Sequence, residues 1–87
     1  MELRIGTSHS LKDKRHVVKS LKEKLRHRHN ISIAEIDFQD QWQLALLAAV
    51  TVSQSRQRAE QILHAVEGEA YSLVGEMLTS TNLEWVD

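Results

Sequence analysis

Hydrophobic and polar residues alternate at the start of the chain, where Leu3 and Ile5 are separated by a polar neighbour. This pattern predicts a short strand that ends at Gly6. The spacing then changes to seven, three and four residues, which is typical of one face of a helix from about residue 11 to residue 28. The apolar positions of this helix are Leu11, Val18, Leu21 and Leu25.

Polar residues mark both ends of this helix. We expect Ser10 to cap its first turn, with Asp13 at the position where a capping box usually has Glu or Gln. We expect Asn30 to cap its last turn, because asparagine tolerates the left-handed backbone conformation.

The middle of the chain is rich in aliphatic residues. The β-branched run from Ile31 to Phe38 predicts a strand, and residues 37–42 form the connection after it. The run from Gln43 to Ser53 suits a buried helix by propensity. Its short length and the residues Val50 and Val52 favour a strand that is apolar on both faces.

The last third of the chain predicts a second helix and a final strand. The helix begins at Ser55 and stops at Gly75. Its apolar face consists of Ala59, Ile62, Leu63, Val66 and Ala70. The segment from Met77 to Val86 alternates loosely, and it predicts a strand with Leu83 and Trp85 on one side.

The order β-α-β-β-α-β predicts an α+β, ferredoxin-like fold, in which two helices cover one face of a four-stranded antiparallel sheet. We expect a single domain that spans residues 1–87.

The third predicted strand is aliphatic on both sides, so the sheet face without helices would expose an apolar patch. Its residues on one side are Leu44, Leu46, Ala48, Val50 and Val52, and those on the other are Ala45, Leu47, Ala49 and Thr51. We therefore expect a homodimer through the open sheet face. The alternative is that the small alanines are shielded by long neighbours such as Gln43 and Trp85.

Charge is divided unevenly along the chain. Residues 1–30 carry nine Lys/Arg and three Asp/Glu, a net charge of +6, and residues 31–87 carry two and nine, a net charge of −7. Such an asymmetry indicates a polyanionic or acidic partner. The chain has neither cysteine nor proline, and its longest apolar run, Leu44 to Val50, is too short to span a bilayer. We expect a cytoplasmic protein without a membrane partner and without a cofactor.

Most of the positive charge falls on the first predicted helix. Five of its cations lie on one side at spacings of three, four, three and four, and no acid interrupts them. This basic stripe consists of Lys12, Arg15, Lys19, Lys22 and Arg26. It can follow the phosphates of a polyanion. The alternative is a solvated helix face whose long side chains cover the edge of the core.

The connection after the second strand is a second candidate site. Its polar and aromatic residues are Asp37, Gln39, Asp40 and Trp42. Acids at a turn could bind Mg²⁺ or hold a water. The alternative is that the turn acids bond to the backbone and that Glu35 faces solvent. Phe38 and Trp42 could stack on bases, or could form a local packing cluster.

The histidines are not spaced in the sequence as metal ligands usually are, so we expect no metal site. They are His9, His16, His27, His29 and His64. The sequence also has no glycine-rich phosphate loop, no nucleophile elbow and no Cys-His pair. Enzymatic activity therefore stays open, with a non-catalytic protein favoured.

Three segments together resemble a known family: Ser10 to Leu21, Ile33 to Asp37, and the turn Gln39-Asp40-x-Trp42-Gln43. The chain is similar, from Glu2 to about Ser53, to the YlxP-like family of small bacterial proteins of uncharacterised function. The resemblance implies a ferredoxin-like fold. Genes of this family often lie beside genes for translation initiation and ribosome maturation, which implies an RNA- or ribosome-linked role. The family offers no catalytic residue to carry over.

The sequence departs from this family at three places. Phe38 stands where members commonly have His, and Gly6 stands where Pro is frequent. Members usually have more apolar residues before the position of Glu2, so the first strand looks shortened. Because that strand is central in the implied fold, a short one would leave ladder groups of its neighbours unpaired.

Three functions are consistent with these features. The first is a non-catalytic RNA- or ribosome-associated module that binds through the basic stripe. The second is a protein–protein interaction module that docks an acidic partner on the same helix. The third is a small enzyme acting on an anionic substrate, with Lys or Arg as the binder and Asp37 or Asp40 as the base.

Overall fold

The computed structural model describes residues 1–6 and 9–86. Its elements follow the predicted order. The strands are β1 (Glu2–Arg4), β2 (Ser32–Asp37), β3 (Leu44–Val50) and β4 (Leu78–Ser80). The helices are α1 (Leu11–Arg28) and α2 (Arg56–Val74), and α2 continues into a short 3₁₀ turn (Gly75–Met77).

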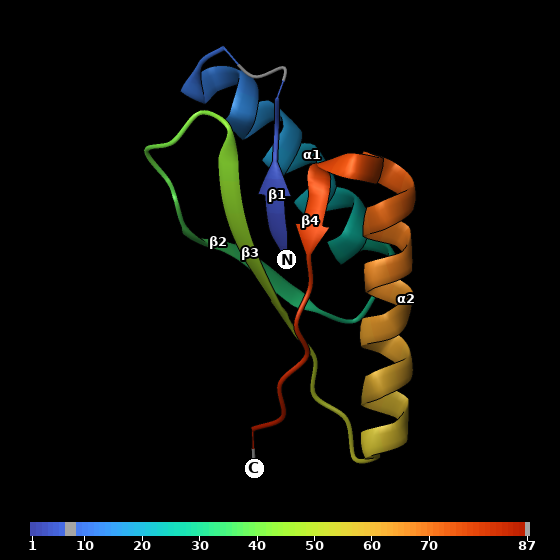
Figure 1. Cartoon of the computed structure of the whole chain (residues 1–87). Coiled ribbons are helices and arrows are strands. Elements are labelled where there is room, and N and C mark those ends of the chain that lie inside the picture. Colours follow the sequence, from blue (N-terminus) through green and yellow to red (C-terminus); the bar gives the residue numbers. More distant parts are fainter. Residues whose placement is uncertain (7–8, 87) are drawn as a thin grey trace.

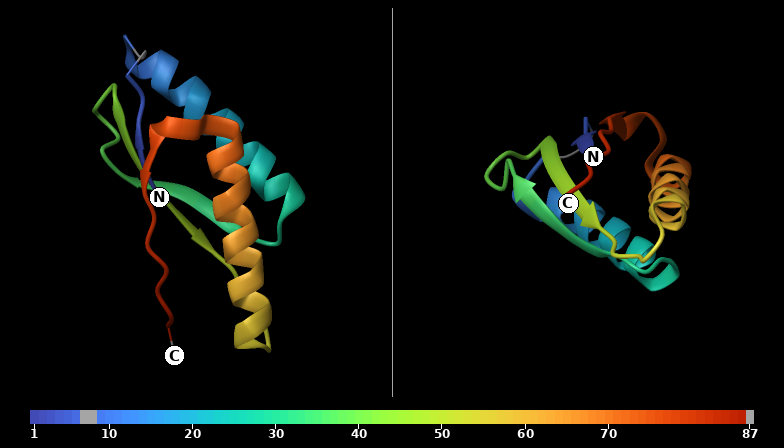
Figure 2. Two further views of the ribbon diagram at one scale, coloured as in Figure 1. Left: turned by 45° about the vertical axis from the view of Figure 1, so that its right-hand side comes forward. Right: turned by 90° about the horizontal axis from the view of Figure 1, so that it is seen from below.

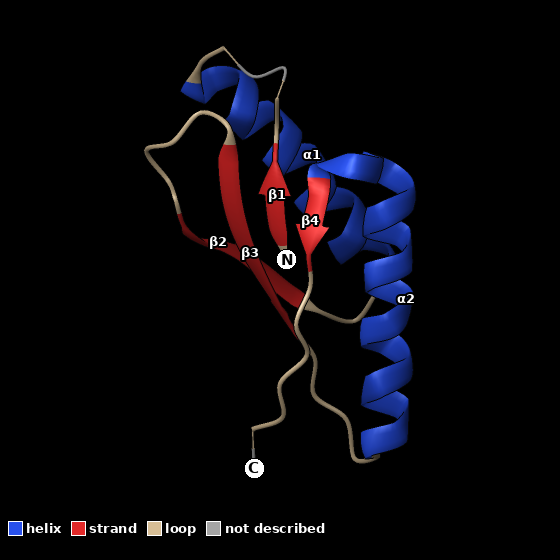
Figure 3. Ribbon diagram, in the orientation of Figure 1, coloured by secondary structure: helices blue, strands red, loops and turns tan. Residues whose placement is uncertain are grey.

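The four strands form one antiparallel sheet in the order β2-β3-β1-β4 (Figure 1, Figure 3). Both helices lie on the same side of this sheet (Figure 2). α1 packs against β2 and α2, while α2 also reaches β4 at the opposite edge of the sheet. The predicted α+β, ferredoxin-like fold with a central first strand is therefore confirmed.

The core lies between the sheet and the two helices. Leu3 is paired with Ala45 across β1 and β3, and both residues are fully buried. Leu47 follows on the same face, since alternate residues of a strand share one side of a sheet. The helices complete this core with Val18, Leu21 and Leu25 from α1 and with Val66 and Ala70 from α2. Each large aliphatic side chain buried here stabilises the fold by roughly 1.5–3 kcal/mol.

Of the two predicted caps of α1, the N-cap is confirmed and the C-cap is wrong. The Ser10 hydroxyl accepts the backbone N–H of Asp13 at 3.1 Å, which confirms the N-cap. The Asp13 carboxylate in turn accepts the N–H of His9 at 3.1 Å. The C-cap prediction was wrong, because His29 and not Asn30 caps the helix. His29 is extended and leads directly toward β2, so the chain needs no left-handed residue at this point.

Ser55 caps α2 by accepting the backbone N–H of Arg58 at 3.2 Å. We expect the Ser55→Ala substitution to lower the free energy of unfolding by about 1 kcal/mol, because it leaves one N–H of the first turn without its acceptor. Urea denaturation followed by circular dichroism measures this change. Ser72→Ala, at an exposed position inside the same helix, is the matched control and should leave stability equal or slightly higher. Equal effects of the two substitutions would contradict the cap.

The final strand is much shorter than predicted. The sequence indicates a strand from Met77 to Val86, but pairing stops at Ser80. The neighbouring strand explains this difference. The ladder between β1 and β3 ends with Met1, whose amino group donates to the Leu47 carbonyl at 2.8 Å. The pairing of β4 with β1 reaches from Leu3–Leu78 to Glu2–Ser80, and residues 81–86 run along the lower part of the molecule as an exposed tail (Figure 1).

One face of the sheet is left without helices. Cross-strand partners share a face, so the pairs Glu2–Leu46, Ala34–Ala48 and Ser32–Val50 define its register. The residues of this open face are Glu2, Arg4, Ser32, Ala34, Asp37, Leu44, Leu46, Ala48, Val50 and Ser80. The sequence assigned the even-numbered positions of β3 to one side of the sheet, and the structure confirms this. Val50 is 61% exposed.

Candidate functional site

The basic stripe lies on the surface of α1. Lys12, Arg15, Lys19 and Arg26 are exposed, and Lys22 is partly exposed. Among the residues that the structure describes, none of the five forms an ion pair with a carboxylate within 4.0 Å. From Lys12 to Arg26 the stripe spans 15 residues, and the 14 rises between them extend over about 21 Å of helix. Its positive charge is therefore not neutralised within the described chain.

The opposite side of α1 faces α2, and cations on that side contact a carboxylate. Arg28 donates to the Glu69 carboxylate at 3.1 Å, and Nε2 of His29 lies 3.4 Å from the same carboxylate. Further along, a groove of about 240 Å³ separates the two helices, with His16 and Lys24 at its polar rim. The acids of α2 thus engage only cations outside the stripe. The stripe points away from α2, on the side of the edge strand β2.

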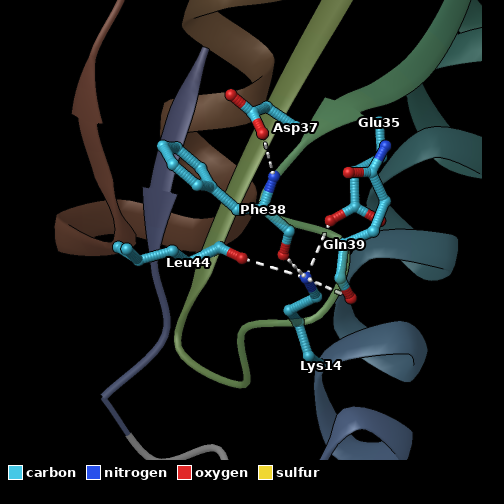
Figure 4. Close-up of polar contacts among 6 residues, drawn as sticks. All are labelled: Lys14, Glu35, Asp37, Phe38, Gln39 and Leu44. Carbon is cyan, nitrogen blue, oxygen red and sulfur yellow. Dashed lines mark hydrogen bonds and ion pairs between the residues drawn. The ribbon is translucent and has the colours of Figure 1, made fainter.

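One cation of α1 is completely buried. Lys14 is 0% exposed, and its ammonium group lies 2.8 Å from the Glu35 carboxylate of β2 (Figure 4). The same Nζ donates to the backbone carbonyls of Phe38 at 2.6 Å, Leu44 at 3.0 Å and Gln39 at 3.4 Å. A buried charge is tolerated when it is paired and hydrogen-bonded, and this lysine has both kinds of partner.

Lys14 joins three elements through these contacts. It holds the start of α1 to the end of β2 and to the first residue of β3, and so fixes both ends of the connection between the two strands (Figure 4). The expectation that Glu35 faces solvent was wrong. Glu35 is paired with Leu47, whose side chain is buried under the helices, so the register turns Glu35 toward α1 and Lys14.

The second candidate site is placed on the surface. Asp37, Gln39, Asp40 and Trp42 are all exposed, and Trp42 is 54% exposed. The Asp37 carboxylate accepts the backbone N–H of Phe38 at 2.8 Å, as a turn residue does. Gln39 contributes only its carbonyl, to Lys14. Phe38 adopts φ = 64°, a left-handed conformation that is uncommon for a residue other than glycine.

Metal ligands are not gathered in the described part of the chain. Among residues 1–6 and 9–86, no three His, Cys, Asp or Glu side chains form a group that could hold a metal ion. Within the same residues, neither helix is long and apolar enough to cross a membrane.

Lys14 is the site residue that the sequence analysis missed, although a signal was present. It lies three residues after Leu11 and four before Val18, so it occupies the apolar face that these positions define. A lysine in the middle of an apolar face indicates a buried cation and calls for a carboxylate nearby. Glu35 shares the face of Ile33, two residues away, and is the matching signal in the second strand.

The topology and the two packed layers place the chain among the ferredoxin-like α+β proteins. More narrowly, the chain belongs to the family described as "Protein of unknown function (DUF503)", whose model matches residues 1–82. It is 37% identical over 76 residues to "Uncharacterized protein YlxP" of Bacillus subtilis (strain 168), an alignment that covers 87% of this chain and 83% of that protein. No solved structure matches the chain. The resemblance to the YlxP-like family is thus confirmed.

Proposed function

We propose that the chain is a non-catalytic module that binds RNA, as free structured RNA or within the ribosome, through the basic stripe of α1. The observation that supports this proposal is the line of five cations without carboxylate partners among the described residues. A regular row of fixed cations neutralises a row of phosphates and releases the counterions that they hold.

The chemistry of α1 favours contacts to the phosphate backbone over contacts to bases. The helix, residues 11–28, contains no Phe, Tyr or Trp, the large aromatic side chains that stack on unpaired bases. Lysine and arginine bind phosphate in any sequence, so the stripe would recognise the shape of a folded or duplex RNA and not its sequence.

Binding to RNA should weaken steeply with salt. Five phosphate contacts give an expected slope of about −3.5 to −4.5 in a plot of log affinity against log salt concentration. Fluorescence anisotropy with a labelled RNA duplex and a labelled ribosomal RNA fragment measures this slope. The Lys12→Glu/Lys19→Glu variant should bind roughly 30-fold more weakly at 0.1 M salt, because two of the five contacts are lost.

A control variant separates the stripe from the total charge. Lys24→Glu/Arg58→Glu changes the net charge by the same amount at two exposed positions outside the stripe. It should retain most of the affinity. Equal losses in the two variants would contradict a localised site. Absence of binding to both RNAs at low salt would contradict RNA binding altogether, and capture of an acidic protein that survives nuclease treatment would then identify the alternative partner.

A further inference from the structure

The open face is an apolar surface that the basic stripe does not involve. Val50 is 61% exposed, and Leu44, Leu46 and Ala48 of the same strand are partly exposed. Both helices lie on the other side of the sheet, so neither helix covers this face (Figure 2). We propose that the open face joins two copies of this chain, with β3 of one copy packed against β3 of the other.

The side-chain sizes along β3 are self-complementary. The open-face residues follow the order Leu44, Leu46, Ala48, Val50. A two-fold axis that crosses the strands between Leu46 and Ala48 places Leu46 opposite Ala48 of the second copy, and Leu44 opposite Val50. Large residues then face smaller ones, which is how two packed sheets interdigitate. Ala34 and Ser32, the neighbours of Ala48 and Val50 on β2, are small and leave room for the incoming leucines.

The charges of the open face favour a second copy over a charged partner. The β3 row is uncharged, β1 contributes one anion and one cation, Glu2 and Arg4, and β2 contributes the anion Asp37, the partner of Leu46. A polyanion or an acidic protein therefore meets no excess of cations here. Pairing through the free edge of β2 is less suitable, because it would bring the two basic stripes close together. Pairing through the open face places them on opposite outer surfaces of the dimer.

The size of the open face indicates a weak, reversible interface. The seven residues of β3 extend over about 24 Å, and three strands are about 14 Å wide, which gives a footprint of about 340 Å² per copy. A standard interface buries roughly 800 Å² of accessible surface on each partner. We therefore expect a reversible dimer with a dissociation constant on the order of 10–100 μM, as weak interfaces of small area show.

Sedimentation equilibrium over about 5–500 μM protein tests this dimer. The wild-type chain should change from monomer to dimer across this range. Ala34→Arg and Val50→Arg place a cation on the open face at positions that are exposed in the single chain, and each should weaken dimerisation at least tenfold. Leu73→Arg, on the exposed surface of α2, is the matched control and should leave the dissociation constant unchanged.

Two results would overturn the proposal. One is a monomer at every concentration, and the other is a dimer that Leu73→Arg weakens while Ala34→Arg does not. Circular dichroism at low concentration establishes whether each variant is folded. If Val50→Arg does not fold, Ala34→Arg alone tests the dimer. The samples contain no nucleic acid, so this outcome is independent of RNA binding.

Discussion

Replacing Lys14 by methionine is expected to lower the free energy of unfolding by about 3–5 kcal/mol. The substitution removes the ammonium group and leaves the Glu35 carboxylate, only 17% exposed, without its cation. The Oε2 atom of Glu35 is buried and makes no directed hydrogen bond within the described residues, so the ionic contact is its main compensation. The carbonyls of Phe38 and Leu44 lose their donor at the same time.

Urea denaturation measures this loss. Lys19→Met removes a cation from the exposed side of the same helix, and its effect should stay within about 0.5 kcal/mol. The double variant Lys14→Met/Glu35→Met should recover part of the loss, because it also removes the unpaired carboxylate. Full recovery is not expected, since the carbonyls that Lys14 bonds remain without a donor. A loss below 1 kcal/mol in Lys14→Met would show that these contacts do not hold the fold together.

The buried ion pair also shows what a sequence pattern can and cannot predict. Spacing placed Leu11, Val18, Leu21 and Leu25 on one face of α1, and the structure confirms that the last three are buried. The same spacing includes Lys14, but an unpaired lysine is unfavourable in a core, so the spacing alone does not predict that it is buried. Its burial depends on Glu35, which is 21 residues away in the sequence. Such a pair becomes visible only when two elements are considered together.

The length of the last strand was predicted wrongly for a similar reason. Alternation from Met77 to Val86 is a local property and predicts a strand, whereas the actual length depends on the neighbour that offers hydrogen bonds. β1 is short, so β4 ends at Ser80. The bulge between Glu35 and Asp37 likewise cannot be predicted from alternation along the strand; it lies beside Phe38, whose carbonyl accepts from Lys14.

The basic stripe was predictable because it requires only helix geometry. Once α1 is a helix with one apolar face, the positions of its cations follow from 100° per residue. The sequence could not indicate which acids approach them. The structure adds that Glu69 engages Arg28 and His29 on the other side of the helix, and that Glu35 engages Lys14. The described acids thus leave the stripe available to a partner.

Substitutions on α1 should separate the stability of the fold from RNA binding, although the core residues and the stripe residues are adjacent. Leu25 is 0% exposed, and it lies between Lys22 and Arg26 along the helix. We expect Leu25→Ala to lower the free energy of unfolding by about 2–5 kcal/mol, because it opens a cavity between the helix and the sheet. The folded variant keeps all five cations of the stripe, so its affinity for RNA at low temperature should equal that of the wild type.

The reverse result is expected for Lys22→Glu/Arg26→Glu. Glutamate has a helix propensity similar to that of lysine, but Arg26 lies in the last turn of α1, where the helix dipole disfavours an anion. The free energy of unfolding should therefore fall by about 1 kcal/mol, less than in Leu25→Ala. Binding to the RNA duplex should weaken roughly 30-fold at 0.1 M salt, and the salt slope should fall by about 1.4–1.8. Urea denaturation and anisotropy on the same four proteins, including the wild type and Lys24→Glu/Arg58→Glu, give both quantities. If affinity instead followed stability across these variants, the cations would act through the fold and the stripe would not be a binding surface.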